Sequence, residues 1–82
     1  MITTESEPFR IVQEYITGNI KVMENTQFNH IDADIVEVAS RVKARLFGNV
    51  KVLILHEASK VFLHGKCGEV INHGGRPYIY NP

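Results

Sequence analysis

The central part of the chain carries apolar residues at intervals of three and four positions. Those that share one face of a 3.6-residue period are Ile31, Ile35, Val38, Ala39, Val42 and Leu46. Acidic residues gather early in this segment and basic residues gather late, which suits the dipole of an α-helix. Gly48 follows, and glycine commonly ends a helix. The pattern predicts an amphipathic helix over residues 31–46.

Two runs rich in β-branched and apolar residues follow the predicted helix. Residues 50–56 and 61–67 flank a polar segment, 57–60, as the strands of a β-hairpin would flank its loop. This register divides the side chains between two faces of a sheet. The core expected beneath the helix consists of Ile35, Val42, Leu46, Val52, Ile54 and Leu63. The outer face carries Leu53, Leu55 and Phe62.

The two ends of the chain carry shorter signals. Residues 1–7 form a polar lead, and Ser6 is a candidate cap for a short helix that ends at Gly18. Residues 20–23 form a short strand, and the glycine-rich turn at 73–76 joins two more β segments. No internal repeat is apparent. The sequence predicts one α+β domain of order α-β-α-β-β, with helices packed on a mostly antiparallel sheet and a C-terminal hairpin.

Residues 32–67 resemble the first half of a BON domain, a small αβ module of bacterial envelope and osmotic-stress proteins. The matching positions are Leu46, Val50, Val52, Val61, Leu63 and Gly65. The turn lacks the glycine usual in that family, and no second amphipathic helix follows Cys67. The resemblance implies a binding or interaction module without catalytic residues.

Composition narrows the classes of function. The chain has 82 residues, with nine basic and nine acidic side chains, so no bulk charge points to nucleic acid or to a membrane surface. Its single cysteine excludes an internal disulfide. No apolar run approaches the length of a membrane span, and the start lacks a secretory signal. We therefore expect a cytoplasmic or otherwise intracellular protein with no membrane partner.

Histidine and cysteine are the first candidate chemistry. His64, Cys67 and His73 are zinc-type ligands, but their spacing matches no closed zinc motif. The predicted register points His64 and Cys67 to opposite faces, so no metal site and no cofactor is predicted. Cys67 with a histidine is also the minimum for a thiol nucleophile. It falls on the predicted core face, where thiol reactivity drops, so catalysis is not expected.

Basic residues near aromatic ones are the second candidate. The predicted register sets Lys51 opposite Lys66, which is unfavourable unless an anion lies between them. The candidate anion- or nucleic-acid-binding residues are Arg41, Arg45, Lys51, Lys66 and Arg76, with Tyr78 for stacking.

The function that the sequence favours is a non-catalytic protein-interaction or regulatory module that forms a homodimer. The predicted contact residues are Leu53, Leu55 and Phe62 on the outer face, with Tyr78 and Tyr80 on an edge strand. One alternative is a small nucleic-acid-binding regulator. A second alternative is a small oligomeric enzyme or metal-binding protein. The sequence does not identify a protein partner.

Overall fold

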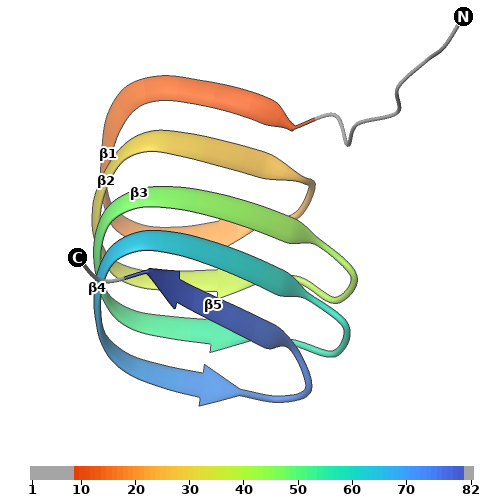
Figure 1. The fold of residues 1–82 in the computed structure, drawn as a ribbon. Coiled ribbons are helices and arrows are strands. Elements are labelled where there is room, and N and C mark those ends of the chain that lie inside the picture. The colour runs from red at the N-terminus through yellow and green to blue at the C-terminus, as the bar shows by residue number, and fades with distance from the viewer. Residues whose placement is uncertain (1–8, 81–82) are drawn as a thin grey trace, which may run out of the picture.

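In the computed structural model, the described residues, 9–80, form five β-strands and no helix. The strands are β1 (Arg10–Val22), β2 (Thr26–Val38), β3 (Lys43–Leu55), β4 (Lys60–Asn72) and β5 (Arg76–Tyr80). They lie in sequence order in one sheet, and every neighbouring pair is parallel. Each of the four long strands bends back on itself, so that its two halves face each other (Figure 1). The result is a β-solenoid-like stack in which each strand and its following turn make one coil.

The predicted α+β architecture is wrong. Residues 31–46 contain the second half of β2, a turn and the start of β3, where a helix was expected. The predicted N-terminal helix is replaced by β1 from Arg10 onward. The polar lead, 1–7, and the Ser6 cap lie outside the described residues. Strand conformation is favoured because each segment pairs along its length with a neighbouring coil, which satisfies its backbone groups and buries its apolar side chains in one core shared by all coils.

The predicted hairpins are also wrong, although the segments themselves are strands. Residues 50–56 and 61–67 fall in or next to β3 and β4. The turn between them carries the chain to the next coil, so β3 and β4 run parallel. The same holds at the C-terminus, where β5 pairs with β4 in parallel. No antiparallel pair occurs among the described strands.

Side chains of the same type stack in columns from coil to coil. One inward column consists of Ile20, Val36, Leu53 and Val70, and another consists of Val12, Phe28, Leu46, Leu63 and Ile79. Between β3 and β4 the offset along the chain is 17 positions, as for Leu46 and Leu63. An internal repeat therefore exists that the sequence did not make apparent. Stacking of this kind buries a continuous core that no single coil encloses alone.

Two glycines near the middle of their strands let successive coils approach closely. Gly48 and Gly65 are register partners, with φ of 145° and 156°. A Cβ at Gly48 would overlap the Ile31 carbonyl oxygen, and one at Gly65 would overlap the Gly48 carbonyl oxygen. Glycine is required here by both backbone conformation and space. The prediction that Gly48 ends a helix is wrong. Its lack of a side chain instead allows the backbone of the neighbouring coil at Ile31 to approach closely.

The core lies between the two halves of the coils. Of the predicted core residues, Val42, Leu46 and Leu63 are buried, which confirms that part of the prediction. Ile35, Val52 and Ile54 are only half-buried, because they alternate with the inward-facing residues. Because residues 9–80 contain no helix, no helix in this part of the chain is long and apolar enough to cross a membrane.

Candidate interaction surface at the C-terminal coil

The last coil of the described chain is incomplete. β5 pairs only with the first half of β4, from Lys60 to His64. The rest of β4, residues 66–72, pairs with β3 on one edge and has no strand partner among the described residues on the other. The end of the solenoid is therefore a step, because β5 adds a fifth strand to one half of the stack, whereas the other half ends with residues 66–72 of β4. We call β5 and residues 66–72 together the C-terminal half-coil.

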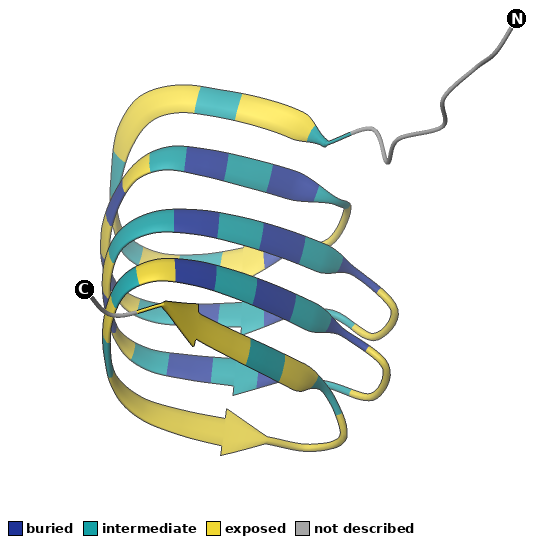
Figure 2. Cartoon of the chain, in the orientation of Figure 1, coloured by how far each residue is buried: buried dark blue, intermediate teal, exposed yellow. Residues whose placement is uncertain are grey.

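Exposed apolar side chains gather on the C-terminal half-coil. Of the eight large hydrophobic residues that are exposed in the described chain, five belong to it: Val70, Ile71, Tyr78, Ile79 and Tyr80. Figure 2 shows the second half of β4 as an exposed band and β5 as mostly exposed, whereas β2, β3 and the first half of β4 alternate mainly between buried and half-buried residues. The sequence places inward-facing residues here, as in the other coils, but no further described coil covers them.

Aromatic stacking holds β5 in place on β4. The rings of Phe62 and Tyr78 are 5.1 Å apart and nearly parallel, at 9°. Phe47 stacks on His64, which stacks on Tyr80, with centroids 4.8 Å apart at each step. These distances match the spacing of neighbouring strands, so the ladders follow directly from parallel register. These ring contacts help to fix the position of β5, which pairs with β4 over only five residues.

The apolar patch predicted from the sequence is wrong in part. Leu53 and Leu55 are fully buried in the core, so neither is available to a partner. Phe62 is half-buried and stacks on Tyr78 within the chain. Tyr78 and Tyr80 are exposed on the last strand, where an edge was expected. The error arose because the buried positions of β3 step by three residues from Val50 to Leu53, so strict alternation from Val50 placed Leu53 and Leu55 on the outer face.

The structure does not bring the candidate basic residues together. Lys51 lies 3.4 Å from Asp34 in an ion pair, and Lys66 is level with Asn49. The predicted opposition of Lys51 and Lys66 is therefore wrong. Arg45 and Arg76 lie near the starts of β3 and β5, far along the coil from Lys66 in β4, and Arg41 lies in the turn before β3. Arg45 points its guanidinium at the Phe62 ring, 5.9 Å from the centroid.

The candidate metal ligands are also dispersed. His64 is part of an aromatic ladder, and His73 stacks on His56 at 5.7 Å. Cys67 packs against the core and donates a hydrogen bond to the Glu69 carbonyl oxygen at 3.2 Å. Burial raises the pKa of the Cys67 thiol, which reduces its thiolate fraction. No group of three histidine, cysteine, aspartate or glutamate residues within 9–80 is arranged to hold a metal ion.

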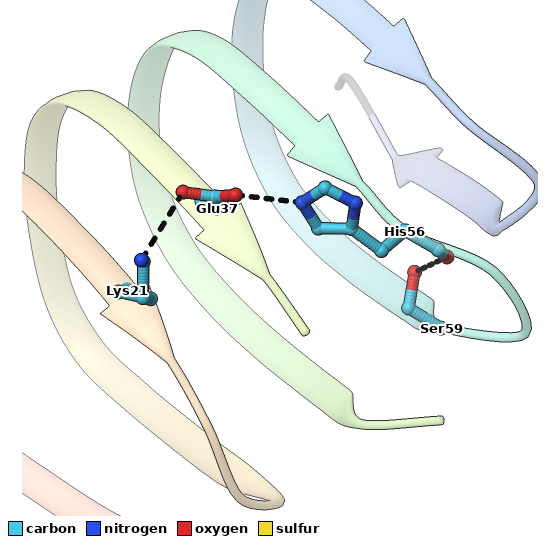
Figure 3. Close-up of polar contacts among 4 residues, drawn as sticks. All are labelled: Lys21, Glu37, His56 and Ser59. Carbon is cyan, nitrogen blue, oxygen red and sulfur yellow. Dashed lines mark hydrogen bonds and ion pairs between the residues drawn. The ribbon is translucent and has the colours of Figure 1, made fainter. Parts of the chain in front are cut away.

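A polar link between coils was missed by sequence reasoning. Glu37 lies 2.6 Å from His56 Nε2 and 3.9 Å from Lys21 Nζ, as Figure 3 shows. The Ser59 hydroxyl donates to the His56 carbonyl oxygen at 2.7 Å and holds the turn. The hydrogen bond from His56 lowers the pKa of the Glu37 carboxyl, and Lys21 adds to the effect. Only the coil offset brings these residues together, so no local spacing could have revealed the link.

Comparison with known proteins finds no matching family model, no similar curated protein and no similar solved structure. The resemblance to BON domains is therefore neither supported nor refuted by a family match.

Proposed function

We propose that this protein is a non-catalytic interaction module, a β-solenoid that associates with copies of itself through the C-terminal half-coil. The observation that carries the proposal is the coincidence of an unpaired strand edge with five exposed apolar side chains. An exposed strand edge offers unpaired N–H and C=O groups, and it is a template for another strand. A contiguous apolar patch favours association, because contact removes it from water.

The opposite end of the solenoid is less suited to this role. β1 has two exposed large hydrophobic side chains, Ile11 and Tyr15, and the Tyr15 hydroxyl donates a hydrogen bond to Asp32. The first residue of β1, Arg10, makes an ion pair with Glu24 at 2.8 Å. Most inward residues of β1 are half-buried or buried. The contrast favours the C-terminal end as the contact surface.

Light scattering coupled to size-exclusion chromatography tests the proposal. We expect the wild-type chain to have twice the monomer mass at high micromolar concentration. Ile79→Glu should yield a folded monomer, because a carboxylate at the contact would be buried without a partner. Met23→Glu is the matched control, since Met23 is also exposed but lies in the turn before β2. It should leave the mass unchanged.

The circular dichroism of both variants should retain the wild-type β signal. A wild-type chain that stays monomeric at high micromolar concentration would contradict the proposal. Equal loss of association in Ile79→Glu and Met23→Glu would show that added charge, rather than the C-terminal half-coil, controls association.

A further inference from the structure

We infer that two copies form a dimer in which β5 of each copy pairs with the free stretch of β4, residues 66–72, in the other copy. Each β5 thereby fills the step at the end of its partner. The inference rests on the proposed function and specifies the partner and geometry of the same surface. The partner is a second copy of this chain, and the symmetry is a single two-fold axis. Each copy then contributes one strand to the other's sheet, so the assembly closes at two.

The shape of the step selects this symmetry. One half of the coil ends with β5, and the other half ends one strand earlier, with residues 66–72 of β4. Consider a two-fold axis that is parallel to the strands and lies midway between the two halves of the coils. Rotation about it places the second copy with its halves interchanged and its coils stacked in the opposite direction. The raised β5 of one copy then lies over the free stretch of β4 in the other. In the register described below, residues 77–80 of β5 lie opposite residues 69–72 of the partner's β4.

The backbone is oriented for the new ladder. The Arg76 N–H donates to the Ser59 carbonyl oxygen, and the His73 N–H donates to the Leu55 carbonyl oxygen, each at 2.8 Å. Both bonds point toward the preceding coil. Because successive residues of a strand direct their backbone groups to opposite edges, those of Ile79 and Val70 point to the free edge. Pro77 also faces that edge without an N–H, so the pairing depends on Ile79.

The side chains match across the same pairing. The two-fold axis makes β5 antiparallel to the partner's β4. It also places the turns between strands at the same end of both copies, which sets the register of the new pair. Ile79 then lies beside the partner's Val70 on the inside, and Tyr78 lies beside the partner's Ile71 on the outside. All four are exposed in the single chain, by 36–40%. The contact continues the core of one copy into the core of the other, as successive coils do within the chain.

A head-to-tail stack is the competing arrangement. It would place β1 of one copy against β5 of another. Ile11 and Tyr78 are the first and last members of the column that contains Phe62, so continuing that column between copies sets Ile11 level with Tyr78. A full-length β1 resting on β5 would leave a gap one strand wide above residues 66–72. The unpaired backbone groups and Val70 would stay exposed, and the assembly would grow without closing. The reciprocal dimer leaves no such gap.

Engineered disulfides distinguish the two arrangements. In a Cys67→Ser background, the double variant Ile71→Cys/Tyr78→Cys places thiols at a pair that does not share ladder hydrogen bonds. Such pairs have Cα atoms about 4.5 Å apart, within the range that a disulfide spans. We expect mild oxidation of the full chain to yield a covalent dimer and nothing larger on a non-reducing gel. Mixing the Ile71→Cys chain with the Tyr78→Cys chain should cross-link the two, whereas neither alone should cross-link.

The double variant Ile11→Cys/Tyr78→Cys is the matched control for the head-to-tail stack, and it should yield no cross-link. A ladder of covalent oligomers from this control, with none from Ile71→Cys/Tyr78→Cys, would overturn the reciprocal geometry but leave association through the C-terminal half-coil standing. No cross-link from either variant, with a monomeric wild-type mass by light scattering, would overturn the proposed function as well.

Discussion

The interior coils and the C-terminal half-coil carry the same kinds of side chain in the same columns, yet they differ in burial. Val36 and Leu53 are 0% exposed, whereas Val70, which continues their column, is 37% exposed. Leu63 is 0% exposed, whereas Ile79, next in its column, is 40% exposed. The chemistry of the column does not change. What changes is whether another coil follows.

This difference shows that burial in the solenoid is supplied by the neighbouring coil. Each coil covers the one before it, so a terminal coil with apolar inward residues is complete only when something stacks on it. Other β-solenoid ends can be closed by polar residues, but the described C-terminal end carries Val70 and Ile79 instead. Within the described residues, the last coil carries the same kind of inward residues as the interior coils, which is the basis of the proposed self-association.

The largest expected effect compares two valines of one column. Val36→Ala removes two buried methyl groups, which should lower the free energy of unfolding by about 1.6 kcal/mol, and the cavity adds to this. Val70→Ala at low concentration, where the chain is monomeric, should cost about 1 kcal/mol or less, since the site is open to solvent. Urea unfolding followed by circular dichroism measures both. Equal costs at low concentration would mean that the terminal coil is already covered within the chain.

A smaller effect concerns the polar link, which the terminal coil lacks. Ile71 occupies the column that holds Glu37 in β2, so no carboxylate stands at that position in the last coil. Because the pKa of Glu37 is lowered in the folded chain, its stabilisation is fully present above the ordinary glutamate pKa of about 4.3. That stabilisation is lost as the pH falls from there through the lowered value.

Glu37→Gln should therefore make the acid-side decline of the melting temperature shallower. Glu14→Gln is the control, because Glu14 is exposed on β1 and makes no ion pair with residues 9–80. Thermal unfolding across the acid range measures the difference. Identical pH profiles for the wild type and Glu37→Gln would show that the link to His56 does not form in solution.

The sequence located parts of β3, β4 and β5, but it assigned most of β1 and β2 to helices and missed the parallel arrangement. Residues 50–56 and 61–67 were predicted as strands because alternation and β-branched content are local signals. The helix prediction failed because inward residues of a bent strand do not keep a strict period of two. In β2 the buried positions are 26, 28, 31, 33, 36 and 38, with steps of two and three residues. Combined with the half-buried Ile35, this spacing imitates a helical face.

The candidate surface was predicted in part for a related reason. Tyr78 and Tyr80 were expected on an edge, because Pro77 in the same segment lacks the N–H that a central strand needs. Leu53 and Leu55 were misplaced, because their burial depends on the parallel offset of 17 positions between β3 and β4. Gly48 and Gly65 repeat at that offset and were the available signal. Register shifts in β1 and β2 disturb the period elsewhere and obscure it.

Residue-resolved amide hydrogen exchange tests the central claim most directly. In a monomer the amides of Val70 and Ile79 face an unpaired edge and should exchange quickly, whereas those of interior strands are paired at any concentration. We expect protection at Val70 and Ile79 to rise with protein concentration while that of Val36 stays constant. Exchange at Val70 and Ile79 that stays fast up to high micromolar concentration would contradict association through the C-terminal half-coil.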